Sequence, residues 1–102
     1  MLEIRRIIII TKLKPSALQT ALEIGEKGGD NGIILLSDAA FMLINEEISM
    51  KLREANTKGV NIYALRNDVE KRGIKIQPFV EVVDYGILVD ILLDPGTNTI
   101  NL

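Results

Sequence analysis

Short apolar runs along the chain predict the strands of a buried sheet. The segment Ile4–Thr11 ends in a continuous β-branched run of four isoleucines and Thr11, a pattern typical of a strand that is covered on both faces. Gly32–Leu36 and Val60–Leu65 have the same character, and Phe79–Asp84 predicts a fourth strand. Residues 97–102 alternate between polar and apolar side chains, which indicates an edge strand.

Segments with a helical spacing of apolar residues separate these strands. Pro15 suits the first turn of a helix that runs toward a pair of glycines. Ser37 and Asp38 are natural N-cap residues for a helix through Leu43, and Asn45 can cap the helix after it. The predicted strand Gly32–Leu36 is therefore followed by two consecutive helical stretches.

The second half of the chain continues the alternation. Asn67 and Glu70 resemble a capping box at the start of a short helix, and Gly73 supplies a left-handed stop. Gly86–Leu93 is a helix that is apolar nearly all round. Strand and helix thus alternate with short connections, which predicts an α/β fold. We expect a three-layer α/β/α sandwich with a mainly parallel sheet of four to five strands, built as one domain over residues 1–102.

Composition excludes several kinds of chemistry. The 102 residues contain no cysteine and no histidine. Disulfides, thiolate nucleophiles, persulfide carriage, the usual zinc ligands and Ser-His-Asp arrangements are therefore excluded for these residues. We expect no catalytic residue, no metal site and no cofactor.

The charge balance and the length of the apolar runs bear on partners and location. A net charge of −2 gives no overall attraction for a polyanion, so we expect no direct contact with nucleic acid. The run Ile7–Ile10 is far shorter than the roughly 20 residues that span a bilayer, and no cleavable signal pattern follows it. We expect a cytoplasmic protein without a membrane contact.

Three aspartates and a glycine-rich stretch are the first candidates for chemistry. Asp38, Asp68 and Asp84 follow predicted strands, where open α/β sheets place their ligand crevices. Two of them could share a metal or a proton, although we favour helix capping because no metal-ligand spacing accompanies them. Gly25–Gly32 resembles a phosphate loop only in composition. It leads from a helix into a strand, so a helix end and turn is the better interpretation.

Other residues are candidates for binding. Ser37 and Asp38, together with Arg66 and Asp68, could line a crevice at the strand ends. Arg66, Lys71 and Arg72 could form a basic rim for an acidic partner surface, the alternative being a solvated helix face. We expect reversal of Arg66 and Arg72 to weaken such docking without lowering stability.

An excess of apolar side chains on one predicted helix indicates a subunit interface. The helix Gly86–Leu93 carries more apolar surface than one contact face requires. We expect at least a dimer, with this helix or the Ser37–Asn45 helix in the contact. The candidate interface residues are Phe41, Met42, Leu88 and Leu92.

Two stretches carry a family resemblance. IYALRNDVEKRGI, residues 62–74, followed by VEVVDYGILVDILL, residues 80–93, resembles the DsrE/DsrF/DsrH sulfur-relay family, most closely its DsrH/TusB-like branch. GIILLSDAAFMLI, residues 32–44, is similar to the second strand and helix of that family. The residues that fit the pattern are Tyr63, Ala64, Leu65, Asp68, Arg72, Gly73, Asp84, Tyr85, Val89 and Asp90.

The resemblance implies a small oligomeric α/β/α protein that acts in sulfur transfer, either in tRNA wobble-uridine thiolation or in sulfur oxidation. It also implies partners, namely DsrE/DsrF- or TusA-like sulfur carriers. In the cysteine-bearing branch a carrier cysteine would follow the third strand, close to Ala64 and Leu65, and this chain has none there. A non-catalytic subunit that docks a cysteine-bearing partner is therefore the first hypothesis.

Two alternatives remain open at this stage. The first is a small-ligand-sensing or structural homo-oligomer with a crevice at Ser37, Asp38, Arg66 and Asp68. The second is an enzyme that uses the carboxylates of Asp38 and Asp84.

Overall fold

The structure, a computed structural model, describes residues 5–102, and these residues form five strands and five helical segments. The strands are β1 (Arg5–Ile10), β2 (Asn31–Leu35), β3 (Asn61–Leu65), β4 (Val80–Val83) and β5 (Thr97–Asn101). The helical segments are α1 (Pro15–Glu26), the 3-10 helix η1 (Ser37–Ile44), α2 (Glu46–Thr57), α3 (Arg66–Lys71) and α4 (Tyr85–Leu93). The predicted order of elements is confirmed; Ile4, the first residue of the predicted first strand, lies outside the described residues.

The strands form one sheet in which every pairing is parallel. Their order is β4-β3-β2-β1-β5, so β1 pairs with β2 on one side and with β5 on the other. Ile8 of β1 lies opposite Ile33 of β2 and Ile100 of β5. The edge position predicted for the last strand is confirmed, and the mainly parallel sheet is parallel throughout these strands.

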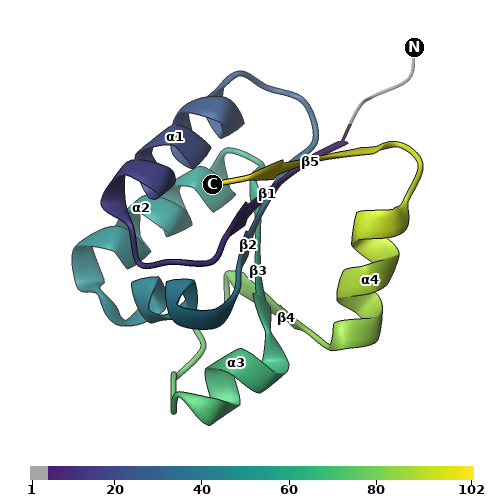
Figure 1. Ribbon diagram of the computed structural model, residues 1–102. Coiled ribbons are helices and arrows are strands. Elements are labelled where there is room, and N and C mark those ends of the chain that lie inside the picture. The colour runs from purple at the N-terminus through teal and green to yellow at the C-terminus, as the bar shows by residue number, and fades with distance from the viewer. Residues whose placement is uncertain (1–4) are drawn as a thin grey trace.

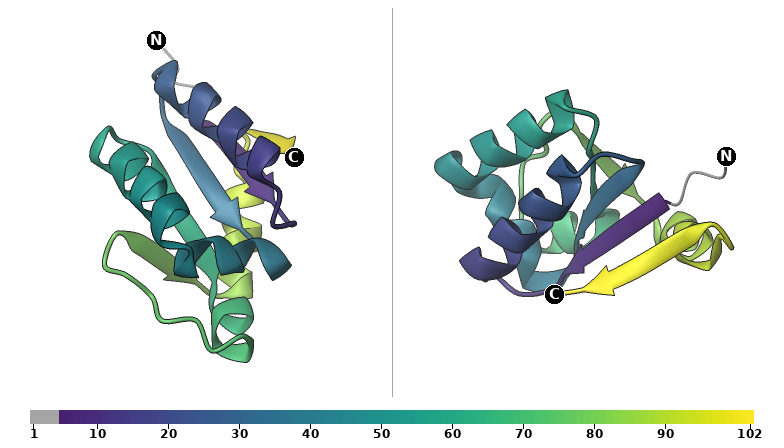
Figure 2. Two further views of the ribbon diagram at one scale, coloured as in Figure 1. Left: turned by 90° about the vertical axis from the view of Figure 1, so that its left-hand side faces the viewer. Right: turned by 90° about the horizontal axis from the view of Figure 1, so that it is seen from above.

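Helices cover both faces of the sheet, although unequally. In Figure 1, α1 and α2 lie on one side of the sheet and α4 lies on the other, and the two views of Figure 2 agree with this arrangement. Helix α3 follows β3 directly and lies at the edge of the sheet where the strands end. The predicted three-layer α/β/α sandwich is confirmed.

The run of isoleucines in β1 supplies both cores. Ile8 and Ile10 pack into the larger core beneath α1, η1 and α2, whereas Ile7 and Ile9 pack into the smaller core beneath α4. Successive side chains of a strand point to opposite faces, so a strand buried on both sides has no polar position. This is the physical reason for the unbroken apolar run.

Two of the predicted helix signals are confirmed. The side chain of Asn45 accepts a hydrogen bond of 3.0 Å from the backbone N–H of Ile48, which caps α2. Gly73 follows α3 with a φ of 64°, the left-handed conformation expected after a helix. The stretch Gly25–Gly32 is the end of α1 and the turn into β2, as predicted.

Two other cap predictions are wrong. Ser37 and Asp38 do not cap a following α-helix; they are the first residues of the 3-10 helix η1, and no side chain caps it. Asn67 and Glu70 do not form a capping box, because α3 begins at Arg66 and Asn67 already lies within its first turn. In both places the N-cap residue is a leucine, Leu36 before η1 and Leu65 before α3, and its side chain cannot accept a hydrogen bond.

Gly32 marks a close approach within the smaller core. A Cβ at this position would lie 2.9 Å from Cδ1 of Ile7 and 3.0 Å from Cε2 of Tyr63, and both of these side chains are buried. A larger residue at this position therefore requires the side chain of Ile7 or Tyr63 to shift.

We predict that Gly32→Ala lowers the free energy of unfolding by about 1–3 kcal/mol, because the added methyl overpacks the smaller core. The matched control is Gly86→Ala in α4, where a Cβ meets nothing within 4 Å and a helical alanine should stabilise by about 0.4–1 kcal/mol. Urea unfolding of both variants measures the difference. Equal stability of the two variants would contradict the packing argument.

The side chain of Tyr63 is a buried phenol, so its ionisation at alkaline pH is coupled to the free energy of unfolding. Burial raises the pKa of Tyr63 above its ordinary value of 10.0, because the charged phenolate is disfavoured inside the protein. The folded state thus holds this proton more tightly than the unfolded chain does.

We predict that the stabilisation linked to this proton is complete below pH 10.0 and is lost as the pH rises through the higher folded-state pKa. Urea unfolding between about pH 9 and pH 11 should show a smaller loss of stability for Tyr63→Phe, which has no phenol to ionise. A parallel decline in the two proteins would show that other groups cause the alkaline loss.

Candidate functional site

The parallel sheet brings most of the candidate binding residues together where the strands have their carboxyl ends. Ser37 and Asp38 follow β2, Asp68 and Arg72 lie in and just after α3, and Asp84 follows β4. All of these positions lie at the carboxyl ends of strands, where open α/β sheets bind ligands. These residues form two separate polar clusters, and the clusters differ in how far their side chains are exposed to solvent.

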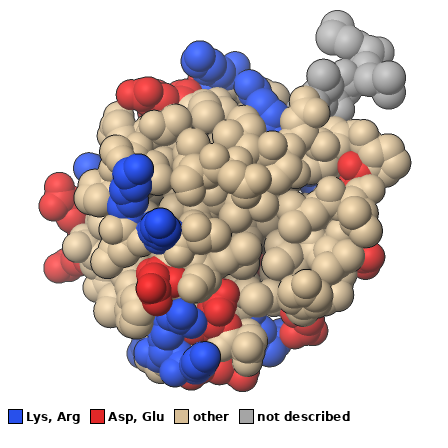
Figure 3. Space-filling view, viewed as in Figure 1, with Lys and Arg blue, Asp and Glu red and all other residues tan. Residues whose placement is uncertain are grey.

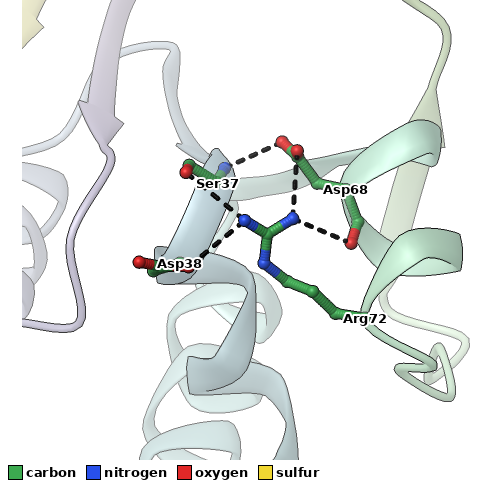
Figure 4. A network of polar contacts seen from close by, with 4 residues as sticks. All are labelled: Ser37, Asp38, Asp68 and Arg72. Carbon is green, nitrogen blue, oxygen red and sulfur yellow. Dashed lines mark hydrogen bonds and ion pairs between the residues drawn. The ribbon is translucent and has the colours of Figure 1, made fainter.

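The first cluster is a network centred on the guanidinium of Arg72 (Figure 4). Nη2 donates to Oδ1 of Asp38 at 3.2 Å and to Oγ of Ser37 at 3.4 Å. Nη1 donates to Oδ1 of Asp68 at 3.3 Å and to the backbone carbonyl of Asp68 at 3.4 Å. The second carboxylate oxygen of Asp68 accepts the backbone N–H of Ser37 at 2.8 Å. The network thereby joins the end of β2 to α3.

This network stabilises the fold, because the side chains at its centre are largely buried. The side chains of Arg72 and Asp68 are each only 17% exposed, and the guanidinium also lies over the ring of Phe41 at 5.8 Å from its centroid. An ion pair that is largely shielded from water is screened far less than a surface pair. Arg72 therefore fixes the β2 end against α3, and both of its Nη atoms already donate within the chain.

This finding corrects two expectations from the sequence. Arg72 does not join a free basic rim, because its donors bind Asp38, Asp68 and Ser37. Asp38 and Asp68 do not cap the helices in which they lie; their carboxylates bind Arg72, and Asp68 accepts the N–H of Ser37 from another element. Both partners lie more than thirty positions away from Ser37 and Asp38 in the sequence, which a local capping pattern cannot reveal.

Ser37 adopts an uncommon backbone conformation at the point where β2 ends. Its φ is 55°, and it is the one non-glycine residue with a positive φ among residues 5–102. Such a conformation persists where surrounding contacts hold it, and here the bond to Asp68 holds the Ser37 N–H. The sharp turn directs the chain from β2 straight into η1.

The second cluster lies between α3 and α4, at the ends of β3 and β4. Nε of Arg66 donates to Oδ1 of Asp84 at 2.7 Å, and the side chains are 53% and 62% exposed. The hydrogen bond that Arg66 donates to Asp84 raises the pKa of Arg66 above its ordinary value. Asp84 occupies the N-cap position of α4 but makes no side-chain cap bond there, so the capping role predicted for it is also wrong.

A shallow hollow of about 380 Å³ accompanies this exposed pair. We call it the β3-end groove; it is lined by Leu65, Arg66, Asn67, Glu70, Asp84 and Tyr85. Lys71, the last residue of α3, is exposed beside it. Figure 3 shows charged side chains of both signs gathered at the end of the molecule where α3 lies. The rim is therefore mixed in charge, and the groove remains open.

A larger, apolar hollow lies beside the ends of β1 and β2. This β1-end groove of about 630 Å³ is lined by Leu13, Pro15, Phe41, Met42, Ile44, Asn45 and Ile48. The sequence predicted a surface role for the Ser37–Asn45 helix but not for Leu13, Pro15 or Ile48. An available signal was the isolated Leu13 between two lysines directly after a strand, where a solvated loop has no need of an apolar residue.

The residues predicted for a subunit interface differ in exposure. Met42 and Leu88 are buried within the chain itself, and Leu92 is half-buried against the smaller core. Phe41 is half-buried under Arg72. The exposed apolar side chains of α4 are Tyr85, Ile87 and Leu93. The interface itself stays a prediction, but among the named residues only Phe41 and Leu92 retain some surface for it.

The carboxylates of the described residues do not gather into a metal-binding group or an acid–base pair. Within residues 5–102, no group of three or more acidic side chains is placed to hold a metal ion. Asp38 and Asp84 belong to different ion pairs, one with Arg72 and the other with Arg66. In the same part of the chain, no helix is both long enough and apolar enough to cross a bilayer.

Comparison with known proteins identifies the family. The model of the DsrH like protein family matches residues 13–96, and this range includes every lining residue of both grooves. The chain belongs to the DsrH-like family. Membership of this family implies a role related to sulfur relay.

One solved structure supports the fold of this DsrH-like chain. A protein of unknown function from Methanobacterium thermoautotrophicum matches with a TM-score of 0.74 and 17% sequence identity. The match covers 98% of this chain and 100% of the other. No curated protein matches the chain. At this identity the likeness concerns the fold alone.

We predict that Asp68→Ala lowers the free energy of unfolding by about 1–3 kcal/mol, because Arg72 and the Ser37 N–H each lose a shielded acceptor. The matched control is Asp84→Ala, which breaks the exposed pair with Arg66 and should leave the urea midpoint unchanged. If Asp68→Ala also left the midpoint unchanged, the network would not hold the β2 end against α3.

Proposed function

We propose that this DsrH-like chain is a non-catalytic subunit of a sulfur-relay complex and that it presents the β3-end groove to a cysteine-bearing partner. The observation that carries the proposal is an open groove at the end of β3 in a chain of this family that has no cysteine. By resemblance, a cysteine-bearing family member would place its thiol at the same strand end. This chain keeps the strand, the turn and α3 without the thiol.

The surface chemistry of the groove supports docking. Arg66 and Asp84 form an exposed pair, and such pairs contribute little to stability, so either side chain can exchange its partner for one on a docking protein. Lys71 adds an exposed cation beside the groove, and Tyr85, which is 71% exposed, adds an aromatic ring. Exposed aromatic and arginine side chains are enriched where proteins bind one another.

The small-ligand alternative has less support. Ser37, Asp38 and Asp68 do lie together, but they bond to Arg72 and to one another. Arg66 lies in the other cluster, bound to Asp84. The polar atoms that a ligand would need are thus already engaged within the network. The proposed relay role covers both pathways that the family resemblance implies, tRNA wobble-uridine thiolation and sulfur oxidation.

We predict that the isolated protein gains no covalent increment of about 32 Da per sulfur when it is incubated with a persulfide donor, because no side chain of the sequence can form a persulfide. Intact-mass spectrometry measures this directly. A cysteine-bearing carrier treated in the same way is the positive control. A stable adduct on this chain would refute the non-catalytic role.

We also predict that Arg66→Glu combined with Lys71→Glu weakens binding to a DsrE- or TusA-like carrier on the order of tenfold, since interface charges set complementarity. The melting temperature should stay unchanged because both side chains are exposed. Lys27→Glu with Lys58→Glu, at the opposite edge of the sheet, is the control with the same change in net charge. Calorimetric titration of all three proteins decides, and equal affinities would remove the β3-end groove from the docking role.

A further inference from the structure

Arg66 is the cation among the residues that line the β3-end groove, and most of its hydrogen-bond donors are unused. Its Nε donates to Oδ1 of Asp84 at 2.7 Å, whereas within residues 5–102 neither of its Nη groups makes a hydrogen bond. The side chain is 53% exposed. A guanidinium holds its donors in a planar fork that suits an anion. The bond to Asp84 therefore orients Arg66 and leaves both Nη groups available to an anion that enters the groove.

The charges around Arg66 balance one another. Asp84 neutralises Arg66 on its Nε side, and Glu70, a second acidic lining residue, lies on α3 next to the exposed Lys71. The neighbouring network around Arg72 is engaged with its own carboxylates. The groove as a whole thus exerts no strong attraction on a distant anion, and water screens what attraction there is. Only a group that reaches the Nη donors directly gains from the charge of Arg66.

Apolar surface adjoins these donors and favours a particular kind of anion. Leu65 and Tyr85 line the same groove, and Tyr85 is 71% exposed. A polarisable sulfur atom packs favourably against an aromatic ring. The terminal sulfur of a cysteine persulfide is such an atom, it carries a negative charge when ionised, and the S–S bond places it about 2 Å beyond the position of a thiol sulfur. The combination of a cation, an aromatic ring and an apolar side chain fits this group better than it fits a carboxylate.

We propose that Arg66 lets this chain distinguish a sulfur-loaded carrier from an empty one, because its Nη groups bind the persulfide anion of the loaded carrier. Near neutral pH a cysteine thiol with an ordinary pKa of about 8.5 is mostly uncharged. A persulfide is more acidic than the thiol, so it releases its proton to water and is mostly an anion at the same pH. A guanidinium gains far more from the anion than from the neutral thiol. The inference rests on the proposed docking function and adds the charge state that the groove selects.

The test measures the affinity of the full chain for a DsrE- or TusA-like carrier in two states, with its cysteine as the thiol and as the persulfide. Calorimetric titration near pH 7 should show about tenfold tighter binding of the persulfide form, the scale of one charge-assisted hydrogen bond. Arg66→Gln removes the cation and should bind the two forms equally. Lys71→Gln is the matched control, because it removes a cation beside the groove and should keep the preference.

A pH series separates charge from shape. As the pH rises through the pKa of the carrier thiol, the empty carrier becomes an anion too, so the preference of the wild-type chain for the loaded form should shrink. In Arg66→Gln the ratio of the two affinities should stay near one at every pH. Circular dichroism and the melting temperature check that the variants are folded, and both should be unchanged because the two side chains are exposed.

The outcomes distinguish this inference from the function on which it rests. Equal affinity of the wild-type chain for the loaded and the empty carrier would overturn the inference and leave the docking function standing. A preference that persists in Arg66→Gln would also overturn it; if that variant bound both forms more weakly by the same factor, Arg66 would contact a carboxylate of the carrier instead. Failure of the wild-type chain to bind either form would refute the docking function itself.

Discussion

Parallel pairing of all five described strands is the constraint from which the other features follow. Parallel neighbours cannot be joined by tight hairpins, so each connection crosses over. The connections before β2, β3 and β5 carry helices to a face of the sheet, whereas α3 before β4 lies at the strand ends. Parallel pairing also places the carboxyl ends of all five described strands on the same side of the sheet, which we call its carboxyl edge. The Arg72 network, the β3-end groove and the β1-end groove all lie along that edge because the turns after β1, β2, β3 and β4 meet there. The opposite edge holds the glycine-rich turn between α1 and β2.

Along that edge, one cluster is shielded and one is exposed, and this difference separates stability from binding. Arg72 and Asp68 are largely buried, and their bonds to Ser37 and Asp38 hold the end of β2 against α3. Arg66 and Asp84 form a shorter ion pair, yet water surrounds it. Distance alone would rank the Arg66 pair as the stronger one. Screening reverses that order, because water weakens the exposed pair and the protein shields the other.

The absence of cysteine changes what a DsrH-like scaffold can do. The fold still presents a strand end and an adjoining short helix, and the groove between α3 and α4 is open. Sulfur transfer through this chain would require a thiol from another protein. The two grooves are also chemically different, since charged residues of both signs line the β3-end groove, whereas the lining of the β1-end groove is apolar apart from Asn45.

The sequence by itself determined the elements whose signals are local. The isoleucine run of β1, the Asn45 cap of α2, Gly73 after α3 and the turn before β2 all follow from short-range patterns, because periodicity and turn chemistry act within a few residues. Only the tertiary structure decided what the polar residues do. Ser37 meets Asp68 across 31 positions and Arg72 meets Asp38 across 34, so the residues expected to cap helices are bound by partners from a distant element. Likewise, Leu13 and Ile44 border one groove only because the parallel sheet sets the connection after β1 beside η1. Burial and charge pairing between distant segments depend on the folded arrangement, which no local pattern encodes.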